Sequence, residues 1–246
     1  MPLHADDAFA VLDLDLHLER IAGGNETEVY RTDDAQYVVK VKSGEEAETL
    51  TIEIEHAFLE AITLQQVADN FAVAVGTDHS IDNYFVLTQN SAGHPQVLAI
   101  QPYLEDAVPL FNIDYTTLSS ADRKAIAKQL RRIIARSLKH YQRSWAMPDL
   151  YGRISQSKKE RKRLNAPHML PWRLWSFIVE RNLLRANNLM MVRDPELRIV
   201  LVDYDPVKRG ELYKFIYYTA RRILFWRDYL LIAIMEKTGY VPTASK

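Results

Sequence analysis

The stretch IVLVDYDP, residues 199–206, places four apolar residues directly before two carboxylates and a proline. A short apolar run that ends in turn residues is typical of a strand buried in a core. Asp203 and Asp205 follow the end of this strand. Because a carboxylate removed from water without a partner is costly, the sequence predicts that Asp203 has one. Asp205 is either a second carboxylate with such a partner or a cap for the segment after Pro206.

The chain around this strand predicts a mainly helical second half. NLMMV, residues 188–192, is expected to form a partner strand, joined to the first by the turn RDPEL. A capping serine and an acidic first turn begin a helix expected over residues 119–145. Its apolar stripe consists of Ile126, Leu130, Ile133, Ile134 and Leu138. Residues 171–180 start with a proline and are expected to be helical, and residues 210–237 form one long helix or two.

The first half predicts a mainly antiparallel sheet with one inserted helix. Strands are expected in the segments 16–24, 28–34, 36–42, 71–80, 82–90 and 96–106, which are rich in β-branched and aromatic residues between turns. The segment 45–70 changes period, since Ile54, Phe58, Leu59 and Ile62 recur at helical spacing. The expected helix therefore lies between the third and fourth strands.

The formal net charge of −1 hides a strong asymmetry between the two halves. Residues 1–120 carry 4 Lys or Arg and 21 Asp or Glu, a charge of −17, whereas the rest of the chain carries +16. Such a split indicates two lobes, mutual attraction of the halves or of two copies, or a basic surface for a polyanion. The basic run KKERKR, residues 158–163, invites a nucleic-acid interpretation, and near the site it could attract an acidic substrate, an anionic lipid head group or RNA. Short runs of this kind are usually solvated surface, so nucleic acid is not the favoured partner.

Composition predicts a cytoplasmic protein without a membrane span. The chain contains no cysteine, which excludes disulfides and thiolate metal sites. No apolar run is long enough to cross a bilayer, and the acidic N-terminal segment lacks the basic region of a signal peptide.

Four short motifs occur in the order found in protein kinases. GGNETEVY, residues 23–30, resembles the glycine-rich loop, and YVVK, residues 37–40, resembles the strand motif V-A-I-K. EHAFLEAI, residues 55–62, resembles the C-helix, and VDYDP, residues 202–206, stands where D-F-G would be. The chain therefore resembles the protein-kinase-like superfamily, in particular the compact bacterial proteins of the YrbL type or the aminoglycoside phosphotransferases.

This resemblance implies an α+β fold with two lobes. Residues 1–105 would form an antiparallel β N-lobe with the nucleotide-binding sheet and the C-helix. Residues 106–246 would form a helical C-lobe that carries a degenerate catalytic loop, a metal-binding hairpin and a basic segment at about residues 153–170.

The resemblance also implies roles for residues that bind ATP. The backbone of Gly23 and Gly24 would approach the phosphates, where no Cβ stands in the way. Lys40 would hold the α- and β-phosphates, although Lys42 is a rival on the same strand face. The adenine would meet the backbone near Gln101 and Tyr103.

Further roles follow for the residues around Lys40 and the metal. Glu55 would orient Lys40, with Glu53 and Glu60 as competitors. Asn188 and Asp203, with Asp205 as a possible third ligand, would hold Mg²⁺, which prefers oxygen ligands. Asn187 competes with Asn188 for this role.

The catalytic loop departs from the kinase pattern H-R-D-L-x-x-x-N. When the pattern ends on Asn188, Leu183 occupies the position of the catalytic aspartate, and when it ends on Asn187, Asn182 does. Asp149 is a remote alternative, 39 residues before Asn188, and could act as the base only if the fold brought its loop back to the site.

Two functions are consistent with these residues. One is an atypical phosphotransferase that uses ATP and Mg²⁺ to phosphorylate a hydroxyl acceptor, which could be anionic. The other is a pseudokinase-type nucleotide-binding module without transfer. A polyanion-binding adaptor that uses the basic half is a third interpretation.

Overall fold

The computed structural model describes residues 18–23, 27–42, 54–89, 95–152, 167–169, 171, 181–193, 196–204 and 210–241. Gly24, Asp205, the basic run at residues 158–163 and most of the helix expected at residues 171–180 lie outside this part of the chain. The fold is α+β, and the chain divides into two compact units. Unit 1 comprises the described residues up to Asp69 and Asp82–Tyr103, and unit 2 comprises Asn70–Ile81 and the described residues from Leu104 onward.

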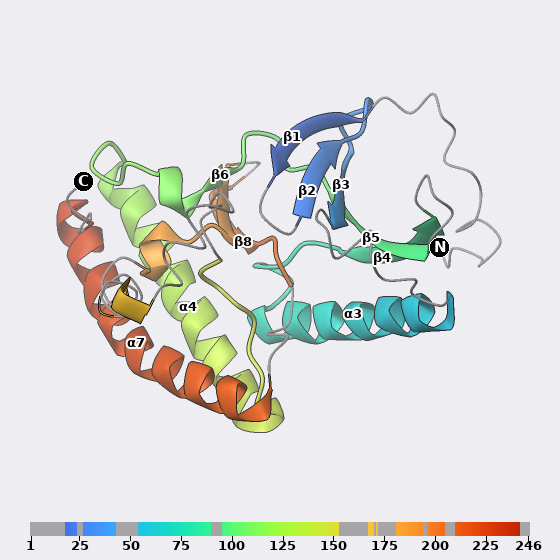
Figure 1. The fold of residues 1–246 in the computed structure, drawn as a ribbon. Coiled ribbons are helices and arrows are strands. Elements are labelled where there is room, and N and C mark those ends of the chain that lie inside the picture. The colour runs from blue at the N-terminus through green and yellow to red at the C-terminus, as the bar shows by residue number, and fades with distance from the viewer. Residues whose placement is uncertain are drawn as a thin grey trace. The chain divides into compact units, whose positions relative to one another are not determined.

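Unit 1 is built on a five-stranded antiparallel sheet with the strand order β1-β2-β3-β5-β4 (Figure 1). Its strands are β1 (Glu19–Gly23), β2 (Thr27–Arg31), β3 (Tyr37–Lys42), β4 (Tyr84–Gln89) and β5 (Pro95–Pro102). The prediction of an antiparallel sheet with one inserted helix is confirmed, because α3 (Ile54–Val75) follows β3 in the chain.

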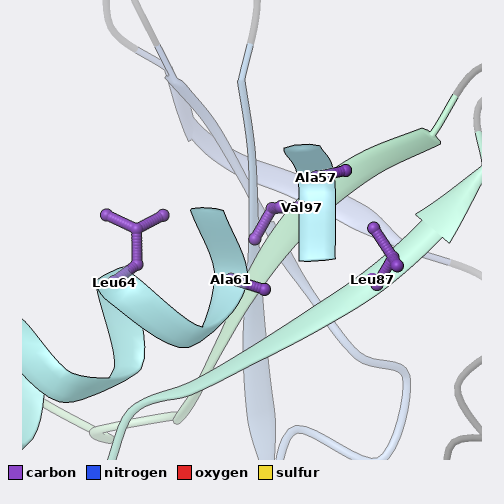
Figure 2. Packing of buried hydrophobic residues seen from close by; sticks show 5 residues of the cluster. All are labelled: Ala57, Ala61, Leu64, Leu87 and Val97. Atoms are coloured by element: carbon purple, nitrogen blue, oxygen red, sulfur yellow. The ribbon is translucent and has the colours of Figure 1, made fainter. Parts of the chain in front are cut away.

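The core of unit 1 lies between α3 and the sheet. Ala57, Ala61 and Leu64 occupy one face of the helix and pack with Leu87 of β4 and Val97 of β5 (Figure 2). Two alanines on this face allow a close approach of helix and sheet, since neither presents more than a methyl group.

One prediction for this region is wrong. The helix that the spacing of Ile54, Phe58, Leu59 and Ile62 predicts does form, with these four side chains on its exposed side. The predicted strand at residues 71–80 is instead the end of α3 and a turn. The alanines and Leu64 define a stripe that continues at helical spacing through Ala68, Phe71 and Val75, so burial of this stripe overrides the local β propensity of FAVAV.

Unit 2 contains a small antiparallel sheet and two long helices. The sheet has the order β6-β7-β8, with β6 (Val108–Pro109), β7 (Leu189–Val192) and β8 (Arg198–Leu201), so the two strands predicted around the turn RDPEL are confirmed. Short 3-10 helices are η1 (Leu110–Asn112), η2 (Pro167–Met169) and η4 (Leu183–Arg185). The long helices are α4 (Ser120–Ser144) and α7 (Glu211–Thr238).

The helix α4 forms as the sequence predicts. The side chain of Ser119 accepts a hydrogen bond from the backbone N–H of Asp122 at 3.0 Å and caps the helix. Ile126, Leu130 and Ile133 are completely buried on the predicted stripe. Burial of this stripe, more than helix propensity, accounts for the stability of such a helix.

The helix α7 is a single helix that packs antiparallel beside α4 (Figure 1). Arg131 of α4 donates to Glu236 of α7 at 2.7 Å, and the rings of Tyr141 and Tyr218 lie 5.5 Å apart. Gly239 ends α7 with a φ of 72°, a conformation that favours glycine. Within the part of the chain that the structure describes, no helix is sufficiently long and apolar to traverse a bilayer.

The strand β8 is held at both edges within unit 2. It pairs with β7 on one side, and on the other Leu201 forms a parallel bridge with Ser80. His79 adds two hydrogen bonds, since its carbonyl accepts from the N–H of Leu201 and its Nδ1 lies 2.9 Å from the carbonyl oxygen of Ile199. The strand that leads to Asp203 is therefore rigidly positioned.

Buried His79 makes the stability of unit 2 depend on pH. Burial lowers the pKa of His79, and the bond to Ile199 and the neighbouring carboxylate of Asp78 offset this only in part, while Arg136 and Arg132 lower it further. Between the ordinary histidine pKa of about 6.5 and the lower folded value, the unfolded chain binds more protons than the folded chain. We therefore expect the free energy of unfolding to rise with pH across this window.

Urea titrations at several pH values between about 5 and 7 would measure this effect. His79→Gln should flatten the dependence, with a residual slope from His140, whose pKa burial also lowers. His168→Gln, at an exposed histidine, is the control. An unchanged slope in His79→Gln would show that other groups dominate the pH dependence.

Candidate functional site

The hairpin of β7 and β8 brings Asn188 and Asp203 close together in the fold. The backbone N–H of Val202 donates to the carbonyl oxygen of Asn188 at 3.0 Å. Asp203 is the next residue and is half-buried, and Asn188 is buried. The amide of Asn188 thus precedes β7 and the carboxylate of Asp203 follows β8. Both groups lie at the same end of the hairpin, as the sequence predicts.

The loop that carries Asp149 returns to this hairpin. We call residues 146–152 the Asp149 loop; it follows Trp145, which ends α4 with a φ of 56°. The side-chain amide of Asn188 donates to the backbone carbonyl of Asp149 at 2.7 Å, and the N–H of Asn187 donates to the carbonyl of Tyr151 at 2.9 Å. The backbone of the Asp149 loop therefore contacts Asn188, while Oδ1 of Asp149 accepts a hydrogen bond from the N–H of Tyr151 at 3.2 Å. The role of Asp149 as a base stays a prediction.

Gly152 leaves room for the amide of Asn188. It has a φ of 69°, and a Cβ added to it would lie 2.3 Å from Oδ1 of Asn188. Contacts this short do not occur between real atoms, so any larger residue would displace the amide. A glycine is therefore needed both for the backbone conformation and for the position of Asn188.

The helix α7 holds the other side of the Asp149 loop. The hydroxyl of Tyr151 donates to Oδ2 of Asp228 at 2.6 Å, and the guanidinium of Arg221 lies 3.8 Å from the centre of the Tyr151 ring. Arg227 also donates to Asp228, at 2.8 Å. Arg221 and Asp228 are both almost completely buried, so these polar groups fix the loop inside unit 2.

Charge and burial shift the acid–base properties of this cluster. Burial raises the pKa of Asp228, and Arg227 and the Tyr151 hydroxyl offset only part of the rise. Burial also raises the pKa of Tyr217, and the carboxylate of Asp149 adds to it. Burial alone would lower the pKa of Arg221. The nearby Tyr217, Tyr151 and Asp149 outweigh this effect, so the pKa of Arg221 is raised. Asp149 thus lies near a neutral phenol and a permanent cation.

The segment that resembles the kinase catalytic loop is part of the core. Leu183 in η4 is completely buried, and so is Asn182. Neither side chain can reach a substrate from this position. In this segment, Asn187 and Asn188 contact the Asp149 loop through the two hydrogen bonds described above.

In unit 1, Lys40 points to the face of the sheet that α3 covers. Lys40 pairs directly with Ala99 of β5, and Ala99 pairs with Phe85 of β4. Directly paired residues share one face, and Phe85 packs against the core beneath α3. Val39 therefore faces away from α3, as the alternation in YVVKVK predicts.

Glu55, which the resemblance implies as the partner of Lys40, lies on the exposed side of α3. Glu55 is exposed, because it precedes the buried Ala57 by two residues and so points to the opposite side of the helix. Glu60 is half-buried and lies three residues after Ala57 and four before Leu64, at the edge of the buried stripe. Of these two glutamates, Glu60 has the orientation that a partner of Lys40 needs.

The remaining candidates in unit 1 belong to strand ends. Gly23 ends β1 and pairs with Glu28 of β2, while Gly24 lies outside the described residues. Gln101 is buried in β5. The backbone N–H of Tyr103 donates to the carbonyl of Gln36 at 2.7 Å, so this N–H is already engaged within the unit. The roles of these residues toward a nucleotide stay predictions.

The oxygen donors of unit 2 suit Mg²⁺ in kind. Mg²⁺ is commonly held by one or two protein carboxylates together with substrate phosphates, and Asp203 and the amide oxygen of Asn188 are donors of this type. Among the described residues, no three His, Cys, Asp or Glu side chains are grouped as a metal site. The expected set contains an amide, and its third member, Asp205, lies outside the described residues.

Comparison with known families and curated proteins assigns no function to this chain. No protein-family model matches the chain, and no curated protein matches it.

Sequence reasoning missed the residues that support the Asp149 loop. They are Tyr151, Gly152, Tyr217, Arg221 and Asp228. The pattern PDLYG marks residues 148–152 as a turn, but nothing in the sequence connects this turn to Asn188 or to α7. The connection requires the fold.

Proposed function

We propose that the protein is an atypical kinase-like phosphotransferase that binds Mg·ATP and phosphorylates a hydroxyl acceptor. The proposal includes the two-lobed protein-kinase-like fold. The observation that carries it is the hydrogen bond from the Asn188 amide to the Asp149 carbonyl. It joins the candidate base to the candidate metal-binding hairpin, although 39 residues separate the two in sequence.

The reaction assigns a role to each group. The Asp149 carboxylate accepts the proton of the acceptor hydroxyl while the acceptor oxygen bonds to the γ-phosphorus. The bond between the γ-phosphorus and the bridging oxygen breaks, and ADP leaves. Lys40 would orient the α- and β-phosphates, and Asp203 and Asn188 would hold Mg²⁺, which would neutralise charge on the phosphates. Tyr151 and Arg221 keep the Asp149 loop in place.

The chain thus departs from kinases in how the base is supplied. A carboxylate from the loop after α4, rather than one just before Asn188, would act as the base. This favours the enzyme over the pseudokinase, for which the buried Leu183 at the expected base position is the supporting observation. Binding of Mg·ATP without turnover across a broad panel of hydroxyl acceptors would decide for the pseudokinase.

A thermal melt with and without Mg·ATP tests nucleotide binding. A ligand present at 100 times its Kd stabilises the native state by about 2.7 kcal/mol, which corresponds to a rise in melting temperature of roughly 5 °C or more for a protein of this size. We expect this rise in the wild type, and we expect EDTA or Asp203→Asn to remove it.

Asp114→Asn is the matched control, because Asp114 is an exposed turn residue of unit 2 that accepts hydrogen bonds from Thr116. It should retain the rise. No Mg-dependent rise in the wild type at saturating ATP would overturn the nucleotide-binding function.

The position of Glu60 leads to a second prediction. We propose that Glu60, rather than Glu55, orients Lys40. A hydrogen bond to a charged group contributes about 1.5–3 kcal/mol, so Glu60→Gln should weaken ATP binding by roughly tenfold or more. Glu55→Gln, at an exposed position of the same helix, should leave it unchanged. Isothermal titration with Mg·ATP measures both, and the opposite order of effects would restore Glu55 to this role.

A further inference from the structure

One face of α7 is apolar and exposed to solvent along most of the helix. We call Leu212, Ile216, Ile223, Trp226 and Leu230 the apolar stripe; each side chain is between 59% and 78% exposed. The spacing of four, seven, three and four residues places them in one line, about 27 Å long at 1.5 Å per residue. Contiguous apolar surface of this kind usually marks a site of interaction.

The neighbouring helix α4 carries a row of exposed cations. We call Lys124, Lys128, Lys139 and Arg143 the basic row, and all four are exposed. Within the described part of the chain, none of them pairs with a carboxylate. Residues 123–145 contain no Asp or Glu, and the only one in residues 212–235 is the buried Asp228. These segments therefore leave the positive charge of the basic row uncompensated.

The basic row and the apolar stripe lie on the same side of the helix pair. The contact between the helices is marked by Arg131 of α4, which donates to the last turns of α7, and by Arg222, whose guanidinium lies 5.6 Å from the centre of the Tyr141 ring. A residue four or eight positions further along an α-helix lies somewhat further around the helix axis. Because α4 and α7 run antiparallel, this rotation carries side chains of both helices toward the same side of the pair. Lys139 follows Arg131 by eight residues, and Trp226 follows Arg222 by four.

We infer that this surface docks on an anionic phospholipid bilayer. Apolar side chains that include a tryptophan enter the boundary between headgroups and acyl chains, while adjacent Lys and Arg bind anionic headgroups. Nucleic acid would satisfy the basic row but would leave the apolar stripe in water. A second copy seated on the same surface would bring two positive rows together. Of these ligands, an anionic bilayer complements both features at once.

Vesicle co-sedimentation of the full chain tests this inference without any use of the proposed activity. We expect binding to vesicles of phosphatidylcholine with about 30% phosphatidylserine, and little binding to pure phosphatidylcholine, because each basic residue near an anionic surface contributes. Ile223→Ser/Trp226→Ser and Lys124→Glu/Lys128→Glu/Lys139→Glu should each weaken binding at least tenfold. Both variants change exposed positions only, so folding should persist and circular dichroism would verify it.

Val73→Ser is the matched control, since Val73 is an exposed apolar residue on α3. Three results would overturn the inference. One is no binding to anionic vesicles. Another is loss of binding in the charge variant alone, with RNA binding lost in parallel, which would indicate a polyanion site. The third is a dimer in sedimentation velocity that the Ile223→Ser/Trp226→Ser variant abolishes while vesicles remain unbound. The result is independent of the Mg·ATP melt, so either proposal can fail alone.

Discussion

Asp149→Asn should strongly slow phosphate transfer while the protein still binds Mg·ATP. Asparagine has nearly the same shape but cannot accept the proton of the acceptor hydroxyl, and a positioned general base contributes about 10²- to 10⁴-fold to the rate. The hydrogen bond that Asn188 donates to residue 149 goes to the backbone carbonyl, so the substitution leaves it intact. The hairpin and its metal ligands should therefore keep their positions.

ATP hydrolysis with water as the acceptor measures this effect before the natural acceptor is identified. The same Asp149→Asn sample should show the full Mg·ATP-dependent rise in melting temperature. Asp114→Asn should have wild-type hydrolysis and a wild-type melt. Wild-type hydrolysis by Asp149→Asn would move the base to another residue, and loss of the thermal rise would assign Asp149 to binding instead of transfer.

Gly152→Ala should destabilise unit 2 and disturb the Asn188 amide. An L-residue with a φ near 69° costs about 1–2 kcal/mol, and the added Cβ would lie 2.3 Å from Oδ1 of Asn188. The displaced amide loses its bond to the Asp149 carbonyl, and an unsatisfied buried group costs about 1–3 kcal/mol. We expect the free energy of unfolding to fall by about 2–5 kcal/mol, with a weaker response to Mg·ATP.

Urea titration measures this loss, and Gly210→Ala is the control. Gly210, the N-cap of α7, has a φ of −59° and no atom within 4 Å of an added Cβ, so the change there should cost at most about 1 kcal/mol, for the poorer cap alone. In an Asn188→Ala background the steric part of the Gly152→Ala effect should disappear and only the backbone part should remain. Full additivity of the two substitutions would contradict the proposed contact.

The sequence predicts those parts of the fold that local pattern determines. The capped helix α4, the strands β7 and β8 and the antiparallel sheet of unit 1 follow from capping, turns and alternation. The buried face of α3 does not. Its contact residues are mostly alanines, whereas the larger Phe58 and Leu59 are exposed, so a pattern based on large apolar residues selects the wrong side. Glu55 is exposed on the same side, and its role toward Lys40 stays a prediction.

The candidate site of unit 2 was predictable in part. Asp203 and Asn188 follow from the pattern of two short strands with polar residues at one end. Asp149 could be named only as a remote alternative, because a hydrogen bond between the Asn188 amide and a carbonyl 39 residues away leaves no trace in local sequence. The buried Arg221 is a further example, since an arginine between aromatic residues on a helix is usually exposed.

The bond between Asn188 and the Asp149 loop also changes how relatives of this chain should be sought. Because the Asp149 loop and Asn188 meet through space, the length of chain between Gly152 and Asn187 is not constrained by the site itself. A search for a catalytic motif of fixed spacing would pass over this protein. A split pattern would retain it: P-D-L-x-G directly after a basic helix, a gap of any length, then N-N before an apolar strand, and a second apolar strand that ends in aspartate. Proteins with a shorter or longer gap should preserve the glycine, because it makes room for the amide.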